Sequence, residues 1–495
     1  MNTWLPWLLG AAHAQSDTPY PPIDWEQAGA ELTELTAGHL QVDTVNPPGN
    51  ETRGAEFLAD VLSREGIPWE IHEHAEGRGT LIARLPGSGA QEPICLLSHI
   101  DVVPGVEADW REGYGPLSGR VDGDGVLWGR GALDMKAMGA IELYTMVLLA
   151  RHRVPLSRDV VLLAVADEEV GQGGMGLVMR ELWDDIGCSH MVNEGAYGFK
   201  DLFFEGQPFY AISVGEKGVL WLRMVASGEP GHGSTPRADG AIERLRGAMV
   251  AIESRDVEPV WHPALLEALH NVGEEHGGLS GFVLQHPALV KLMLKSKLMG
   301  NELTRAAVTT TVNITGLGGA NEPNVLPSEA WANLDCRLQP GVTREMLLTE
   351  LDTLVDSPHI RFEEINHQVP GVSDWDDPLY RALAHHSVQG LEHAVAGPVI
   401  SVGYTDSILA REVGVKAYGL IPFLLGQDEM EGIHGDDERV SVAELLRGLQ
   451  VIFRTIHDVS ADPTGEWVEP GPVPPSPFAL PPQPDEDGAY APSTR

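Results

Sequence analysis

The chain has 495 residues, of which 72 are acidic and 33 are basic, so its formal net charge is −39 at pH 7. A surface this acidic repels nucleic acid and anionic membranes, and we therefore expect no nucleic-acid partner. No internal stretch approaches the roughly 20 apolar residues of a membrane-spanning helix, so no membrane span is expected. The length exceeds the size at which one hydrophobic core keeps growing, which predicts two domains.

Both ends of the chain differ in composition from the part between them. Residues 1–15 resemble a signal peptide, because an apolar run is followed by the small-x-small pattern Ala12-His13-Ala14. This pattern predicts a periplasmic or secreted protein. No Lys or Arg precedes the apolar run, however, so a cytoplasmic location remains the alternative. Residues 461–495 are rich in Pro and lack periodicity, which predicts a disordered tail.

The first half of the chain alternates strand-like apolar runs with helical patterns. Strands are expected at residues 94–98 and 160–166, a helix at 135–151, and a further strand near the end at 417–421. Strands that alternate with helices are typical of a parallel sheet covered by helices on its faces. We therefore predict an α/β fold whose catalytic domain is built on a mainly parallel sheet.

A segment of different character interrupts this domain. Two adjacent strands are expected at residues 309–315 and 330–338, within an order of elements close to βαββαβ. We therefore predict an inserted α+β lid or dimerisation domain at 216–368, which divides the catalytic domain into 25–215 and 369–460.

Apolar helical patterns fill much of the insert between residues 257 and 307. Such helices could line a pocket for a fatty or aromatic acyl group, or they could only pack on the lid. Both alternatives remain open.

The three cysteines, Cys95, Cys188 and Cys336, are too few and too scattered to predict a disulfide framework or a cysteine-type zinc site. Cys95 lies within the apolar run I-C-L-L and is expected to be a small core residue.

Five residues of metal-ligand type lie in five separate segments of the chain. They are His99 in S-H-I-D, Asp134 in G-R-G-A-L-D-M-K, Glu169 in A-D-E-E-V-G, Glu194 in V-N-E-G and His434 in I-H-G-D-D-E-R. Two imidazoles and three carboxylates can hold two divalent ions if one carboxylate bridges them, and such a pair activates water for hydrolysis. Zinc suits this mixed ligand set, and cobalt and manganese also fit. Each residue alone could be structural, but coincidence is a poor explanation for all five motifs in this order.

Neighbouring carboxylates predict two supporting roles. Asp101 lies two residues after His99, on the same side of an extended segment, where it could accept a hydrogen bond from the second imidazole nitrogen. Glu168 and Glu169 are adjacent and must point apart, so one can bind metal while the other acts as general base. Asp134 lies where a Gly-rich loop becomes a helix, which predicts that it caps that helix.

Several further segments carry a resemblance to a known family. They are G-H-G-S-T-P, N-V-L-P, R-L-Q-P-G and G-Y-T-D-S, which all lie between the motifs of Glu194 and His434. In this order the chain resembles, over residues 25–460, the co-catalytic zinc peptidases that include aminoacylase-1, bacterial glutamate carboxypeptidase and succinyl-diaminopimelate desuccinylase. The branch of carboxypeptidase S and the secreted N-acyl amino acid hydrolases is the most similar.

The resemblance implies a role for each ligand-type residue. Asp134 would bridge two ions, one of which would also bind Glu169 and His434 and the other His99 and Glu194. Glu168 would be the general base, and Asp101 would lie behind His99.

Three residues of the insert also correspond to family positions. His232 would stabilise the oxyanion, and in dimeric relatives this histidine comes from the partner subunit, so a homodimer formed through the lid is implied. Arg337 and Asn324 would contact the substrate. Two residues depart from the pattern: Asn193 stands where Asp is common, and Ile408 where Arg is frequent. The second departure weakens any inference about which end of the substrate is held there.

These residues predict an enzyme that hydrolyses an amide bond next to a free carboxylate, in an N-acyl amino acid or at the C-terminus of a peptide. A dipeptidase or exopeptidase with the same site is the nearest alternative. A non-catalytic binding protein on this scaffold would require a broken site, and a two-metal phosphoesterase fits poorly with a charge of −39.

Overall fold

The computed structural model describes residues 20–464. The predicted signal peptide, residues 1–15, lies outside the described residues, as does the predicted disordered tail apart from residues 461–464. Within residues 20–464, no helix is long and apolar enough to cross a membrane.

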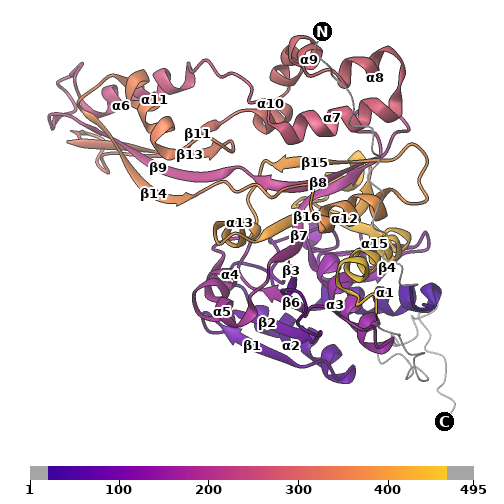
Figure 1. Cartoon of the computed structure of the whole chain (residues 1–495). Helices are drawn as coiled ribbons and strands as arrows, with labels where there is room; N and C mark the ends of the chain where they lie inside the picture. Colours follow the sequence, from indigo (N-terminus) through magenta and orange to yellow (C-terminus); the bar gives the residue numbers. More distant parts are fainter. Residues whose placement is uncertain (1–19, 465–495) are drawn as a thin grey trace, which may run out of the picture.

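The larger part of the molecule is built on an eight-stranded sheet with the order β1-β2-β6-β3-β7-β16-β8-β15 (Figure 1). Its strands are β1 (Trp69–Glu73), β2 (Gly79–Leu85), β3 (Ile94–His99), β6 (Val160–Val165), β7 (His190–Phe199), β8 (Phe209–Glu216), β15 (Val395–Ser401) and β16 (Lys416–Leu425). Neighbours among β6, β3, β7 and β16 run parallel, whereas β1 and β2 are antiparallel additions at one edge. The predicted α/β fold with a mainly parallel sheet is confirmed.

Helices cover both faces of this sheet, which is why its central strands are apolar throughout. On one face lie α1 (Trp25–Gln41), α2 (Glu51–Arg64), α3 (Lys136–Arg151), α12 (Pro378–Val388) and α15 (Val442–Ser460). On the other lie α4 (Gly173–Leu177), the π-helix η2 (Val178–Leu182), α5 (Trp183–Ile186) and α13 (Ser407–Glu412). Every residue of β3 is buried: Leu96 belongs to the core on the first face, and Leu97 to that on the second.

A second, four-stranded antiparallel sheet has the order β11-β13-β9-β14 and lies beside the first (Figure 1). The elements β9 (Gly218–Ser227), α6 (Ala241–Glu253), β11 (Thr311–Gly318), β13 (Glu329–Leu338), α11 (Arg344–Val355) and β14 (Ile360–Gln368) follow one another as βαββαβ. Burial alternates along β13, because only one face of this sheet is covered by α6 and α11. We call this unit the lid.

Four helices between α6 and β11 do not belong to the core of the lid. They are α7 (Pro263–His276), α8 (Gly278–Leu284), α9 (Pro287–Gly300) and α10 (Glu302–Val308). Helix α7 packs on β15, at the edge of the eight-stranded sheet, and buries Ala268 and Leu269 against Phe209 and Val395. The alternative that these helices only pack on the lid is therefore wrong, while their proposed role in an acyl pocket stays a prediction.

The remaining elements are short. The strands β4 (Arg120–Val121), β5 (Val126–Trp128) and β17 (Arg439–Ser441) form a small sheet, and β10 (Gly231–His232) pairs with β12 (Val325–Leu326). The 3-10 helix η1 (Glu107–Asp109) and α14 (Gln427–Met430) lie in loops.

Cys95 is a buried core residue, as expected, but it also forms a disulfide with Cys188, which the scattered positions of the cysteines did not predict. The two residues are 93 positions apart in the sequence. They meet because β3 and β7 are parallel neighbours in which Ile94 lies opposite His190. Spacing along the chain could not reveal this proximity. Cys336 is buried and free.

Candidate metal centre

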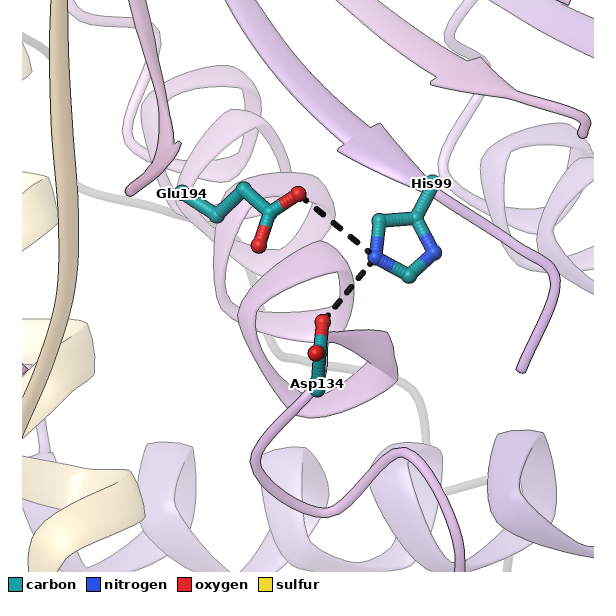
Figure 2. A group of neighbouring side chains, drawn as sticks. All are labelled: His99, Asp134 and Glu194. Carbon is teal, nitrogen blue, oxygen red and sulfur yellow. Dashed lines mark hydrogen bonds and ion pairs between the residues drawn. The ribbon is translucent and has the colours of Figure 1, made fainter. Parts of the chain in front are cut away.

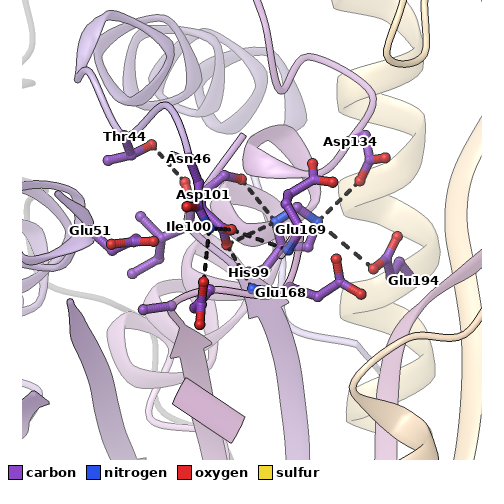
Figure 3. Close-up of polar contacts among 12 residues, drawn as sticks. Thr44, Asn46, Glu51, His99, Ile100, Asp101, Asp134, Glu168, Glu169 and Glu194 are labelled. Carbon is purple, nitrogen blue, oxygen red and sulfur yellow. Dashed lines mark hydrogen bonds and ion pairs between the residues drawn. The ribbon is translucent and has the colours of Figure 1, made fainter. Parts of the chain in front are cut away.

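The five ligand-type residues converge at the carboxyl edge of the central parallel strands, where ligands of such sheets gather. His99 is the last residue of β3, Glu169 follows β6, and Asp134 precedes α3. Glu194 lies within β7, just beyond the part that pairs with β3, and His434 lies in the loop between α14 and β17. Elements that are far apart in sequence thus present their polar groups to one place (Figure 3).

His99, Asp134 and Glu194 form the first group of potential metal ligands (Figure 2). The Nε2 atom of His99 lies 3.1 Å from Oδ1 of Asp134 and 3.7 Å from Oε1 of Glu194. The three ligand atoms all lie within 4.8 Å of one another. One ion in their midst could therefore contact all three.

Asp134, Glu169 and His434 form the second group. The Nε2 atom of His434 lies 3.1 Å from Oδ2 of Asp134 and 3.2 Å from Oε2 of Glu169. Asp134 thus presents one carboxylate oxygen to each group, which is the arrangement that a bridging ligand requires. The side chain of His434 is 51% exposed, so this group opens to solvent.

The chemistry of the two groups fits divalent cations. Glu169 has a buried carboxylate oxygen, Oε1, without a hydrogen-bond partner among the described residues. Burial and the negative charge of Asp134 raise the pKa of Glu194 well above its usual range. The hydrogen bonds of His434 with Asp134 and Glu169 raise its pKa to about 10. Carboxylates crowded in this way are stabilised as anions when a dication lies among them.

Asp101 supports the site in a different way from the one predicted. The Nδ1 atom of His99 lies 2.9 Å from the backbone oxygen of Asp101 and 3.6 Å from its carboxylate, so the carbonyl is the partner. The carboxylate instead accepts hydrogen bonds from the backbone N–H groups of Glu168 and Glu169, and from the Asn46 amide. The Asp101 carboxylate is thus bound to the segment after β6, although it lies close to the imidazole. Asp101 therefore fixes both His99 and the turn that carries the two glutamates.

Glu168 belongs to neither ligand group, although it is the sequence neighbour of Glu169. Its carboxylate lies close to that of Glu194 in the buried part of the site (Figure 3). Burial, together with the charge of Glu194, raises the pKa of Glu168 well above its usual range. A carboxylate with a raised pKa that does not bind metal is suited to accept and return a proton.

The loop before α3 is held by two residues that the sequence analysis missed. The N-cap position of α3 is occupied by Met135 and not by Asp134, and it has no side-chain capping hydrogen bond, so the predicted capping role was wrong. The carboxylate of Glu438 accepts hydrogen bonds from the backbone N–H groups of Gly131, Leu133 and Asp134. Arg130 pairs with Glu438 at 2.9 Å. Arg130 lies in the motif G-R-G and Glu438 in H-G-D-D-E-R, next to ligand-type residues. That proximity in sequence was the signal that could have identified them.

The two departures from the family pattern lie on the buried side of the site. Asn193 donates hydrogen bonds to the hydroxyls of Thr405 and Ser407, which a carboxylate could not do. Ile408 is fully buried in α13. The sequence analysis also missed Asp406, whose pKa is raised to about 7 by its burial, with charges such as that of Asp101 adding to the effect.

The structure places the three predicted lid residues apart from the two ligand groups. His232 and Asn324 meet where β10 pairs with β12, since the N–H of Gly233 donates to the Asn324 carbonyl, and both side chains are exposed. The Nδ1 atom of His232 accepts a hydrogen bond from the Ser234 N–H, which leaves Nε2 directed outwards.

Arg337, on β13, pairs with Asp335 and lies 5.1 Å from the ring of Tyr404. Burial and then the charge of Glu168 raise the pKa of Tyr404, so this ring is near Glu168 as well as Arg337.

The sequence profile of peptidase family M20/M25/M40 matches residues 95–458, which include all five ligand-type residues. The chain belongs to this family. Members are metal-dependent hydrolases of amide bonds, and a residue cluster that can hold metal is present here, so the chain is a hydrolytic enzyme.

Relatives and solved structures agree with this assignment. The human N-fatty-acyl-amino acid synthase/hydrolase PM20D1 is 27% identical over 453 residues, which cover 87% of this chain and 88% of the relative. Pig aminoacylase-1 is 26% identical over 437 residues, covering 86% and 94%. The metallo-carboxypeptidase Sso-CP2 of Sulfolobus solfataricus has the same fold, with a TM-score of 0.64 at 18% identity over 87% of this chain and 99% of that one.

Proposed function

We propose that the protein hydrolyses N-acyl amino acids with an apolar acyl group, using two zinc ions held by the two ligand groups. The observation that carries the two-ion site is the position of Asp134, which presents Oδ1 to His99 and Oδ2 to His434. The acylase assignment is supported by similarity along most of the chain to proteins named N-fatty-acyl-amino acid synthase/hydrolase and aminoacylase-1. An exopeptidase with the same site is the alternative.

The ions, when bound, would supply an activated water and polarise the scissile carbonyl. In this proposal Glu168 takes the proton of the water and returns it to the leaving amine. Its position beside Glu194 and its raised pKa support that role. Arg337 binds the substrate carboxylate, because its Nη1 is buried and has no partner among the described residues, and its fork matches a carboxylate.

His232 and Asn324 complete the proposed site. His232 would donate a hydrogen bond from Nε2 to the oxyanion, and Asn324 would contact the substrate beside it. Because both are exposed on the lid and outside the ligand groups, they reach a substrate only when a lid closes over it. The closing lid is that of the same chain or that of a second copy in a homodimer.

The experiment is amine release by the purified, zinc-supplemented chain from a panel of N-acyl amino acids and dipeptides, with metal content measured on the same samples. We expect chelator-sensitive turnover that is higher for long than for short acyl groups, and two zinc ions per chain. The Glu168→Gln variant, at equal metal content, is the control for contaminating hydrolases. Turnover restricted to dipeptides would identify the protein as an exopeptidase and not an acylase. One ion per chain would refute the two-metal site.

We further propose that the protein is exported to the periplasm or secreted. The disulfide between Cys95 and Cys188 supports this location, since such bonds persist in oxidising compartments. The protein is taken from its native compartment into denaturant that contains a thiol-blocking reagent, and the labelled thiols are counted. We expect one labelled thiol, that of Cys336. Three free thiols would argue for the reducing cytoplasm.

A further inference from the structure

The outer surface of α8 and α9 carries large apolar side chains that no described residue covers. Leu279 and Leu292 are 81% and 78% exposed, the highest values among the large apolar residues of the described chain. Phe282 and Met293 lie beside them, at 52% and 58%. We call these four side chains the α8–α9 patch. Single exposed apolar residues are ordinary, but four on two contacting helices indicate an interaction surface.

Helix α9 is apolar on two opposite sides. One side buries Val290 and packs Leu294 against the core that α7 forms with β15. Leu292 lies on the opposite side, about 200° around the helix from Val290, Met293 lies between the two sides, and both are exposed. Figure 1 shows α8 and α9 outside α7, on the side away from the eight-stranded sheet. Packing within this chain therefore accounts for only one of the two apolar sides.

The charge of this segment is opposite to that of the whole molecule. Residues 277–300 contain no Asp or Glu, although 72 of the 495 residues are acidic. They include Lys291, Lys295 and Lys297, all exposed. Lys295 pairs with Glu258, whereas the other two lysines have no ion pair among the described residues.

The acidic side chains nearest in sequence stand at the borders of the segment, Glu274 and Glu275 in α7 and Glu302 in α10. The patch itself thus combines apolar side chains with a local excess of positive charge.

We propose that the α8–α9 patch docks the enzyme on an anionic lipid surface. The apolar side chains enter the headgroup region while the lysines face anionic headgroups, as in amphipathic helices that lie in the interface. The 14 residues of α9 extend about 21 Å, less than the roughly 30 Å of a bilayer core, so the helix lies on the membrane without spanning it.

The net charge of −39 does not prevent this contact. Charges further away than about 8–10 Å are largely screened at physiological ionic strength, so the lipid surface responds to the groups on the docking face. The acidic remainder of the surface would instead orient the molecule, with α8 and α9 turned towards the membrane. This proposal concerns binding alone and does not depend on the proposed substrate.

The test is co-sedimentation of the full-length chain with vesicles of phosphatidylcholine, with and without phosphatidylglycerol. We expect binding to the anionic vesicles that weakens with added salt. The Leu292→Gln/Met293→Gln variant should bind about tenfold or more weakly, because two apolar side chains no longer enter the interface. The Lys291→Gln/Lys297→Gln variant should lose most of the preference for anionic vesicles.

The matched control is Val106→Gln/Val413→Gln, which removes two apolar side chains that are 61% and 54% exposed elsewhere on the molecule. It should bind vesicles like the wild type, and all variants should hydrolyse a water-soluble short-chain substrate at the wild-type rate. Absence of vesicle binding, or equal weakening in the control, would overturn the proposal. So would self-association in solution that the Leu292→Gln/Met293→Gln change abolishes, because the patch would then be an interface between copies.

Discussion

Asp134 presents Oδ1 to His99 and Oδ2 to His434, each at 3.1 Å, so the loop that carries it decides where both ligand groups lie. Glu168 and Glu169 divide two roles between adjacent positions. Glu169 joins a ligand group, whereas Glu168 stays outside both, and the Asp101 carboxylate holds the backbone of the two residues in place. The assignment of binding and proton transfer to these two residues can be tested by equal changes at each.

Glu168→Gln should lower kcat for an N-acyl amino acid by about 10²–10⁴-fold, because the amide cannot accept a proton. The bound metal should stay at the wild-type level. The same change at Glu169 removes a charged ligand and should lower the metal content under dialysis against a weak chelator. Steady-state kinetics and elemental analysis on matched samples check both statements. Metal loss from Glu168→Gln instead would place Glu168 among the ligands.

Glu438 and Arg130 act on the metal centre through the backbone. Both are almost fully buried, and the Glu438 carboxylate accepts hydrogen bonds from three backbone N–H groups of the loop before α3. Glu438→Gln leaves the Arg130 charge without its partner and should lower the free energy of unfolding by about 3–5 kcal/mol. Urea denaturation of the chelated proteins measures this cost without a contribution from metal. A loss below about 1 kcal/mol would mean that the loop keeps its shape without the pair.

Among the elements, those with strong periodicity or long apolar runs could be predicted from sequence. Strands β3, β6 and β16 and helix α3 lie where the apolar patterns placed them, because burial on both faces demands apolar residues in any such sheet. The disulfide, the true cap of α3 and the packing of α7 on β15 could not be predicted. Each depends on which elements become neighbours, and local sequence does not encode that.

The same limit applies to the site. The motifs named the five ligand-type residues, and the structure brings them together in two groups, although their assignment as ligands stays a prediction. Asp101 was assigned the wrong contact, since its carbonyl is the partner of His99 and its carboxylate binds the backbone of Glu168 and Glu169. Asp406 lies in the G-Y-T-D-S motif, but its environment could not be predicted, because it is created by burial near Asp101 and Glu216.

Asp458, near the end of α15, connects this helix to α12 and to the first described residue. It accepts hydrogen bonds from His386 at 2.9 Å and from Tyr20 at 2.8 Å. Burial alone would raise the pKa of Asp458, but the hydrogen bonds from His386, His457 and Tyr20 hold it below its ordinary value. The folded state therefore binds this proton more weakly than the unfolded state, where the pKa is about 3.9. The resulting stability is fully present above the unfolded pKa of about 4 and is lost progressively as the pH falls from there towards the lower pKa of the folded state.

Asp458→Asn should therefore lower the free energy of unfolding by about 2 kcal/mol at pH 7. Below about pH 4 the carboxyl takes up a proton in the unfolded wild type before it does so in the folded one, so the difference between the two proteins should shrink as the pH falls. Denaturation curves at pH 7 and at about pH 3.5 check the sign. A difference that grows at the lower pH would contradict the depressed pKa.

At the scale of the whole molecule, the chain crosses between the two sheets at neighbouring points. Strand β8 ends at Glu216 and β9 begins at Gly218, while Val372, after β14, bridges back to Gly215. Lys217 lies at the crossing, and burial lowers its pKa to about 8. The lid is thus joined to the catalytic sheet by two short adjacent segments and, between α6 and β11, by the helices α7–α10. Most of its own core is independent of that sheet.

This connection leaves His232 exposed, with Nε2 directed away from its own loop and outside both ligand groups. If a second copy supplies this histidine, Glu168→Gln and His232→Ala should each be inactive alone but should complement each other. Co-expression with two different tags and tandem purification isolates the mixed assembly. One of its two sites is then intact, and we expect about half of the wild-type activity.

The control is a mixed assembly in which one chain carries both changes and the other is wild type, since it contains no intact site when His232 is exchanged. This assembly should be inactive under the shared-site prediction. If the lid instead closes on its own chain, the wild-type chain keeps a complete site, so the control would be active and the complementing pair would stay inactive. A pair of measurements therefore decides between the two forms of closure, because they differ only in which copy carries the histidine.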